Sequence, residues 1–181
     1  MADPELPPLR LPERLTDGVV LLDAHRLEDA EVHLRGEDEE MRRRFDAARP
    51  ATLAETRRAM RRWIDGRTAG RPMLAYALRT PSGLLMGGCE LRMCSAGAAN
   101  ISYWLFPQFR GRGHALRAVA LLCEAARNGT GLRRLEARIA PDNAPSRRVV
   151  EKAGFAEAGL VDETSDTGVT SRQILYIKTV E

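Results

Sequence analysis

The sequence has few lysines and no long apolar run, and each shortage excludes a class of protein. Lys152 and Lys178 are the only lysines, so arginine carries almost all of the positive charge, and the formal net charge is only +3. So small an excess favours an acidic small ligand over binding along nucleic acid. No apolar run is long enough to span a bilayer. We therefore expect a cytoplasmic protein with neither a membrane nor a nucleic acid as its partner.

Cysteine is also scarce, and the three cysteines do not suit a disulfide or a metal site. Cys89 and Cys94 are five positions apart on an expected strand, which places their side chains on opposite faces, and Cys123 makes the number odd. His25 and His33 have no cysteine or carboxylate companions at metal-ligand spacing. The sequence thus predicts reduced thiols and no bound metal.

The length and composition are those of one ordinary domain. With 181 residues, of which 44% are hydrophobic, the chain is long enough to bury a core of its own. The start of the chain is acidic and rich in proline, without an apolar centre. We expect a single domain over residues 1–181, in which residues 1–13 form a flexible proline-rich arm.

The hydrophobic pattern changes between helical and strand periods along the chain. Thr52 and Glu55 form a capping box at the head of a helix that we expect to end at Gly66. Three consecutive antiparallel strands follow, and then helix, strand, helix, strand and strand. This order indicates an α+β (α/β) domain around one mixed sheet. The expected strands are 17–24, 73–80, 84–95, 100–106, 133–140, 155–160 and 171–180, and the expected helices are 25–36, 39–45, 52–66, 112–127 with a cap at 128–131, and a two-turn helix within 141–154.

A glycine- and arginine-rich stretch lies where a strand passes into a helix. Gly111 and Gly113 alternate with Arg110 and Arg112 just before the expected helix. A helix start exposes unpaired N–H groups with partial positive charge, and glycines let a ligand approach the backbone closely. Several convergent N–H donors with arginines beside them are typical of a site for a diphosphate.

The segment "RGRGHA", Arg110 to Ala115, resembles the Arg/Gln-x-x-Gly-x-Gly/Ala signature of the GNAT (Gcn-five-related N-acetyltransferase) superfamily. About thirty residues further on, "NAPS" (143–146) and "EKAGF" (151–155) follow in the family's order, and "ISYWLFPQFRGRGHA" is most similar to the RimJ/RimL-like branch. The resemblance implies the GNAT fold, a mixed, mostly antiparallel twisted sheet of about six or seven strands with about four helices. It also implies acetyl-CoA as cofactor and a primary amine as acceptor.

Carried over by position, the resemblance assigns most of the cofactor site to one loop and one strand. The pyrophosphate would lie on the backbone of the loop, and the pantetheine arm would pair with the strand in a gap between it and residues 133–140. A strand N–H near Leu105 would stabilise the oxyanion, and His114 occupies a variable position of the signature. The assigned cofactor residues are Trp104, Leu105, Phe106, Arg110, Gly111, Arg112, Gly113, His114, Ala115, Asn143 and Ser146.

The catalytic groups depart from the family's pattern. Val150 stands where the family often has a proton-donating tyrosine, and Ser146 stands where RimL-like members have a serine in that role. The alternative for Ser146 is a simple helix cap. Asn100 replaces the glutamate that serves as base, so Glu90 on the neighbouring strand is the substitute, with a surface ion pair to Arg92 as the alternative.

The resemblance leaves several functions open. The leading one is transfer of an acyl group to a protein N-terminal amine, and the next is transfer to a small amine such as an antibiotic or polyamine. A third is a regulatory module that binds CoA without turnover. The resemblance also leaves a homodimer through the final strands open. Arginines at 42–44 and at 57, 58, 61 and 62 are read as solvated helix faces that could attract an acidic substrate.

Overall fold

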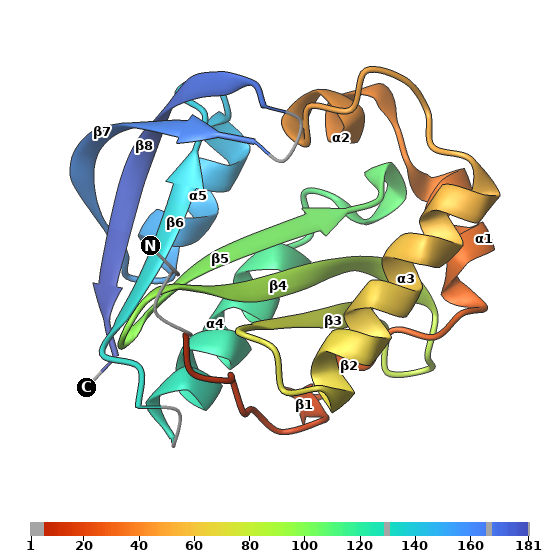
Figure 1. Cartoon of the computed structure of the whole chain (residues 1–181), viewed down its shortest axis with the longest axis horizontal. Coiled ribbons are helices and arrows are strands. Elements are labelled where there is room, and N and C mark those ends of the chain that lie inside the picture. Colours follow the sequence, from red (N-terminus) through yellow and green to blue (C-terminus); the bar gives the residue numbers. More distant parts are fainter. Residues whose placement is uncertain (1–5, 129–130, 166–167, 181) are drawn as a thin grey trace.

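The computed structural model describes residues 6–128, 131–165 and 168–180, which form one sheet with helices on both of its faces (Figure 1). The elements are β1 (Leu15–Thr16), β2 (Leu21–Asp23), α1 (Asp29–Gly36), α2 (Glu39–Arg44), α3 (Leu53–Thr68), β3 (Met73–Arg79), β4 (Leu85–Ser95), β5 (Ala98–Leu105), a 3-10 turn η1 (Pro107–Phe109), α4 (His114–Arg127), β6 (Arg134–Ile139), α5 (Ala144–Lys152), β7 (Ala156–Thr164) and β8 (Thr170–Thr179).

The strands lie in the order β1-β2-β3-β4-β5-β6-β8-β7. Every neighbouring pair is antiparallel except β5 and β6, which run parallel for three residues at their beginnings. The expected mixed, mostly antiparallel sheet and the three-strand meander of β3, β4 and β5 are confirmed. Within the described part of the chain the sheet has eight strands and five α-helices flank it, slightly more than the six or seven strands and four helices expected.

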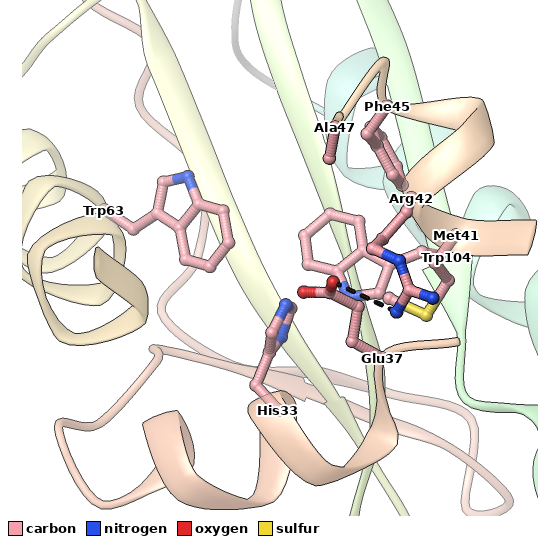
Figure 2. Close-up of a pocket in the computed structure, with 8 residues that line it drawn as sticks. All are labelled: His33, Glu37, Met41, Arg42, Phe45, Ala47, Trp63 and Trp104. Carbon is pink, nitrogen blue, oxygen red and sulfur yellow. Dashed lines mark ion pairs between the residues drawn. The ribbon is translucent and has the colours of Figure 1, made fainter. Parts of the chain in front are cut away.

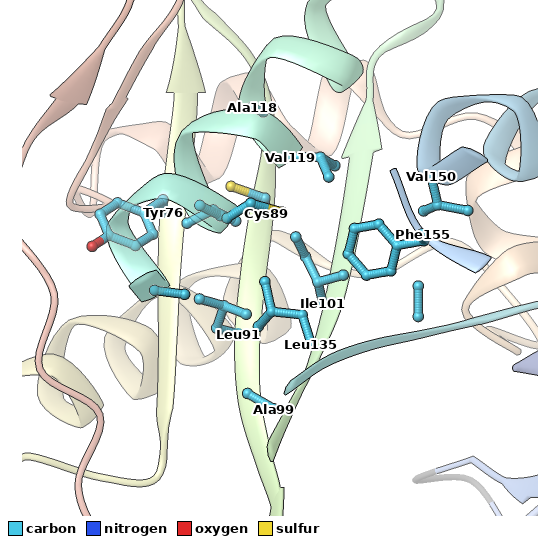
Figure 3. Close-up of a cluster of buried hydrophobic side chains, with 14 of the residues drawn as sticks. Tyr76, Cys89, Leu91, Ala99, Ile101, Ala118, Val119, Leu135, Val150 and Phe155 are labelled. Carbon is cyan, nitrogen blue, oxygen red and sulfur yellow. The ribbon is translucent and has the colours of Figure 1, made fainter. Parts of the chain in front are cut away.

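The two faces of the sheet are covered by different helices (Figure 1). Helices α4 and α5 pack over the larger core cluster, in which Leu91, Ile101 and Leu135 of the sheet meet Val119 of α4 and Val150 of α5 (Figure 3). Helices α1 and α3 lie on the opposite face, against a smaller cluster. Because β-strand side chains alternate between faces, β5 supplies both layers at once.

The capping box predicted for α3 is present. The Thr52 hydroxyl accepts the N–H of Glu55 at 3.3 Å, and the Glu55 carboxylate accepts the N–H of Thr52 at 2.8 Å. The helix extends two residues beyond the expected end at Gly66. Gly66 has no positive φ and is buried, whereas the chain turns at Gly70, where φ is 61°. The glycine that ends a helix is the one in the left-handed region.

The first part of the chain differs most from expectation. Leu9, in the segment predicted to be a flexible arm, is only 3% exposed, and the Tyr76 hydroxyl donates to the Pro12 carbonyl at 2.7 Å. The expected strand 17–24 forms only over β2, and an unexpected two-residue strand, β1, pairs with it. Residues 1–5 of the arm and residues 129–130 of the cap expected after α4 lie outside the described residues.

A buried arginine fixes α1 against the sheet. Arg79, at the end of β3, is 2% exposed and donates to both carboxylate oxygens of Asp29 at 2.9 and 2.6 Å. Its Nε donates to Asp23 of β2 at 2.7 Å. Burial alone would raise the pKa of Asp29, but the hydrogen bonds from Arg79 and from the Arg26 N–H hold it below its usual value. The start of α1 is therefore bonded to β3 through Arg79, and the same arginine joins β3 to β2.

Candidate active site

The loop before α4 presents open backbone. Gly111 and Gly113 both have positive φ, 73° and 80°, and Gly113 is the N-cap of α4. A Cβ built on either glycine would meet no other atom within 4 Å, so the space over this helix start is empty. The N-terminus of a helix leaves its first N–H groups without helical partners, and these groups favour an anion. The helix begins at His114, two residues later than expected.

A gap opens beside this loop because β5 and β6 diverge (Figure 1). The two strands pair only from Ala98 to Asn100 on β5. The N–H of Phe106 donates to the Met86 carbonyl of β4 at 2.9 Å, so Phe106 faces β4. Because successive residues of a strand point their backbone groups to alternate sides, Leu105 faces the gap. Of the three strand residues assigned to cofactor pairing, Leu105 is thus the one directed there, whereas the amide of Phe106 is engaged within the sheet.

Two adjoining cavities form a groove through this gap. The first, about 300 Å³, is lined by Leu105, Gly111, Ala115, Asn143 and Ser146, which the sequence assigned to one site. The second, about 560 Å³, lies between β5, β6, β8 and the end of α2, and shares Asn143 and Ser146 with the first. We call the two together the groove. The structure therefore brings the two sequence motifs to the lining of one space.

Arg110 and Arg112 behave differently. Arg110 makes a bidentate ion pair with Asp38, the N-cap of α2, at 2.7 and 2.8 Å, and its Nε donates to the Leu105 carbonyl at 2.9 Å. The hydrogen bonds from Arg110 hold the pKa of Asp38 below its usual value. Arg112 is exposed, and none of the described residues forms an ion pair with it. Arg112 is therefore the arginine of this loop whose charge is available to an anion.

Asn143 and Ser146 lie at the start of α5. The Ser146 N–H donates to Asn143 Oδ1 at 3.2 Å, so Asn143 caps the helix. Tyr103 of β5 donates its hydroxyl to the Ser146 carbonyl at 3.0 Å. Burial raises the pKa of Tyr103 to about 12, and this tyrosine keeps its proton. The backbone of Ser146 is thus fixed from two sides, while its side chain lines the groove.

The residues at the positions that depart from the family's pattern lie in different parts of the structure. Val150 is fully buried in the core and is not among the residues that line the groove. Asn100 lines the larger cavity, and its Oδ1 is buried without a hydrogen-bond partner among the described residues. Glu90 forms an ion pair with Arg92 at 3.1 Å and lines neither cavity of the groove.

Other carboxylates lie closer to the groove than Glu90. Asp142 lines the larger cavity and bonds Arg44 at 2.6 Å and Arg43 at 2.8 Å, which holds its pKa at about 2. These arginines, expected on a solvated face, instead join α2 to the loop before α5. Asp46 also lines this cavity, adopts a φ of 51°, and has no ion-pair partner among the described residues. Sequence reasoning missed Asp46, and its unusual backbone is a signal that only the structure provides.

An aromatic pocket adjoins the groove on the α1 and α3 face (Figure 2). It measures about 160 Å³ and has Trp63 and Trp104 as walls, whose rings stack with centroids 5.6 Å apart. Phe45, which lines both cavities of the groove, also lines this pocket. The Trp104 side chain therefore belongs to the pocket, although its backbone lies in the cofactor strand.

Metal ligands and membrane segments were searched for in the same residues. In the described ranges no three His, Cys, Asp or Glu side chains come together as a metal ion requires. None of the helices in those ranges combines the length and the apolar character needed to cross a bilayer.

The sheet is split between two parallel strands, and a glycine loop and a helix N-terminus lie at the split, as the resemblance to the GNAT family implies. The family model "Acetyltransferase (GNAT) domain" matches residues 20–156, and the chain belongs to this family.

Two curated Bacillus subtilis (strain 168) proteins are similar to parts of this chain. "Probable N-acetyltransferase YjcK" is 38% identical over 79 residues, 42% of this chain and 44% of that protein. "Uncharacterized N-acetyltransferase YycN" is 36% identical over 59 residues, 33% of this chain and 37% of that protein. The chain thus aligns with less than half the length of each.

Solved structures agree in fold. RimJ of Mycobacterium smegmatis in complex with CoA-disulfide superposes with a TM-score of 0.76 at 25% identity, over 95% of this chain and 85% of that one. RimL, a ribosomal L7/L12 alpha-N-protein acetyltransferase in complex with coenzyme A, superposes with a TM-score of 0.80 at 17% identity, over 92% of this chain and 98% of that one. The resemblance read from the two motifs is confirmed at the level of family and fold.

Proposed function

We propose that the protein is an acetyl-CoA-dependent N-acetyltransferase that moves the acetyl group directly to a primary amine in the groove. The observation that carries the proposal is the junction of the strand gap with the left-handed loop of Gly111 and Gly113. Membership of the acetyltransferase family and the CoA complex of the neighbour RimJ support acetyl-CoA as the donor.

The loop would hold the diphosphate of the cofactor. Outward N–H groups at the start of α4 supply donors, the empty space over Gly111 and Gly113 admits the phosphates, and Arg112 adds charge. The arm of the cofactor would follow β5 into the gap, where the Leu105 backbone is directed. Arg110 contributes by positioning, because its guanidinium ties α2 to the loop through Asp38.

Bound acetyl-CoA supplies the acetyl group as a thioester. The attacking amine must give up a proton and the leaving sulfur must gain one, so the chain has to provide a base and an acid. We propose Ser146 as the acid, since its side chain lines both cavities. Glu90 stays a prediction for the base, and Asp46 is a second candidate because it lines the larger cavity without an ion pair.

The acceptor that we favour is a protein N-terminal amine. The RimJ/RimL-like motifs and the similarity to RimJ support it, and a small-molecule amine is the alternative. Core burial of Val150 and the amide at Asn100 favour a third candidate, a CoA-binding module with little turnover. A homodimer and a cytoplasmic location stay predictions.

The test is CoA binding by calorimetry and CoA thiol release over a panel of peptides and amines. Gly113→Val would place its side chain in the space for the phosphates and should abolish CoA binding. Gly83→Val is the matched control, since Gly83 has a φ of 93° and the same empty surroundings, but lies in the turn between β3 and β4. Each variant costs about 1–2 kcal/mol of backbone strain. Normal CoA affinity in Gly113→Val would overturn the proposal, and binding without thiol release would favour the module.

A further inference from the structure

The aromatic pocket beside the groove has the size of one ring. Its volume is about 160 Å³, close to the cavity of about 150 Å³ that accepts a benzene molecule in another protein. The stacked indoles of Trp63 and Trp104 line it, and Phe45 meets Trp104 edge-on with centroids 5.9 Å apart (Figure 2). Aromatic walls arranged in this way favour a further flat ring through stacked and edge-on contacts.

Three polar atoms around this pocket lack hydrogen-bond partners among the described residues. They are Nε1 of Trp104, Nδ1 of His33 and Oε1 of Glu37, and the last of these lies 3.6 Å from Arg42 in an ion pair, which is longer than a hydrogen bond. Trp104 is more than nine-tenths buried, at 8% exposed, so its N–H has no ready access to solvent. A buried donor or acceptor left unpaired is costly, and these three suit a ligand that can both donate and accept a hydrogen bond.

The charges around the pocket nearly cancel. Glu37 is ion-paired with Arg42 at 3.6 Å. Burial lowers the pKa of His33 to about 4 and that of the neighbouring His25 to about 3, so both rings are neutral near pH 7. The side chains around the pocket thus carry no net charge that calls for a charged ligand, and an uncharged ring suits it.

The pocket communicates with the groove. Phe45 lines both cavities of the groove and the pocket, and Met41 and Trp104 line the pocket and the smaller cavity. The backbone of Trp104 is adjacent to Leu105, which faces the gap. A ligand with its ring in the pocket can thus extend its chain past Phe45 toward the reacting end of the cofactor.

We propose that this pocket selects acceptors carrying an uncharged aromatic ring with a polar edge, such as a phenol, a few bonds from the primary amine. The part of this proposal that concerns the amine rests on the proposed function, whereas binding of the ring does not. Two sources share this chemistry, a free arylalkylamine and a peptide whose first residue is tyrosine. Tyramine and a tyrosine-led peptide are therefore separate arms of the test.

The ring can be tested without any acetyl transfer. The chain has two tryptophans, and both line this pocket, so selective tryptophan fluorescence reports on it alone. We expect p-cresol, which has the ring and no amine, to change this emission saturably, and cyclohexanol to do so much less. Absence of a saturable p-cresol signal would overturn the proposal, whatever the enzyme does.

Variants at the mouth of the pocket provide the control. Ala47 lines the pocket and is exposed, so Ala47→Leu should fill the space and lower p-cresol affinity by at least about tenfold without harming the fold. Ala48→Leu is the matched control, because Ala48 is also exposed but is not part of the lining. Equal affinity in the two variants would contradict the proposed place of the ring.

Turnover then separates the two proposals. We expect tyramine to have a kcat/KM about tenfold above that of the same amine without the ring hydroxyl. We expect a peptide that begins with tyrosine to show the same advantage over peptides that begin with phenylalanine or alanine. Ala47→Leu should remove this preference. If p-cresol binds but no amine is acetylated, the ring site stands and the proposed function fails. If amines are acetylated with no preference for the phenol ring, the ring site is wrong and the proposed function stands.

Discussion

The buried contact of Arg79 with Asp29 offers a sharp test of what holds α1 to the sheet. Asp29→Asn keeps the size of the side chain but removes the negative charge opposite a guanidinium that is 2% exposed. Removing one partner of a buried ion pair costs about 3–5 kcal/mol, because the other charge is left in the interior. Arg79 keeps its bond to Asp23, so the lower end, about 3 kcal/mol, applies. For a chain of this length, that loss lowers Tm by roughly 6–12 °C.

Two further variants isolate the buried charge. Glu31→Gln breaks the ion pair with Arg57, in which both side chains are more than half exposed, and should cost under about 1 kcal/mol. The double variant Asp29→Leu with Arg79→Met replaces the pair by apolar groups and should be more stable than Asp29→Asn alone. Urea unfolding with a common m-value gives each free energy. A cost for Asp29→Asn no larger than that for Glu31→Gln would refute the reasoning.

Acid provides an independent check of the same contact. The folded pKa of Asp29 is lowered, so its contribution to stability is complete above its unfolded value of about 4 and is lost as pH falls through the folded pKa. The difference in unfolding free energy between the chain and Asp29→Asn should therefore shrink below about pH 4. A difference that stays constant into strong acid would contradict the ion-pair explanation.

Further predictions concern the chemistry and one helix. Ser146→Ala should lower kcat by roughly 100-fold or more while the fold is kept, because the cap of α5 uses only the backbone N–H of Ser146; Ser82→Ala, in an exposed turn, is the control. Asp46→Asn, which suits the same positive φ, should lower kcat similarly, while Glu90→Gln should change kcat less; the reverse ranking would make Glu90 the base. Thr52→Ala should cost about 0.5–2 kcal/mol in urea unfolding.

Features that depend on neighbouring residues could be predicted from the sequence. The alternation in β4, the Thr52 and Glu55 capping box and the glycines before α4 are each contained in a few adjacent positions, and all three recur in the structure. The two-residue strand β1 is too short to carry a period, and it forms only because β2 pairs with it.

The features that were missed depend on residues far apart in the chain. Asp38 lies 72 positions before Arg110, and nothing local to "FRGRGHA" indicates that its first arginine is engaged. Trp63 and Trp104 come from α3 and β5, so their shared pocket exists only after the sheet has formed. The family motifs located the groove, but the groups available around it are set by tertiary contacts.

The divergence of β5 and β6 has a thermodynamic consequence. Ile101, Leu135 and Phe155 belong to the core on the α4 face, and β8 secures the far side of β6 by six antiparallel pairs. The packing that stabilises the native state thus also holds β5 and β6 apart. No hinge motion is needed to open the gap between them. Molecules that enter such a prearranged slot are spared the entropic penalty of ordering a loop on arrival.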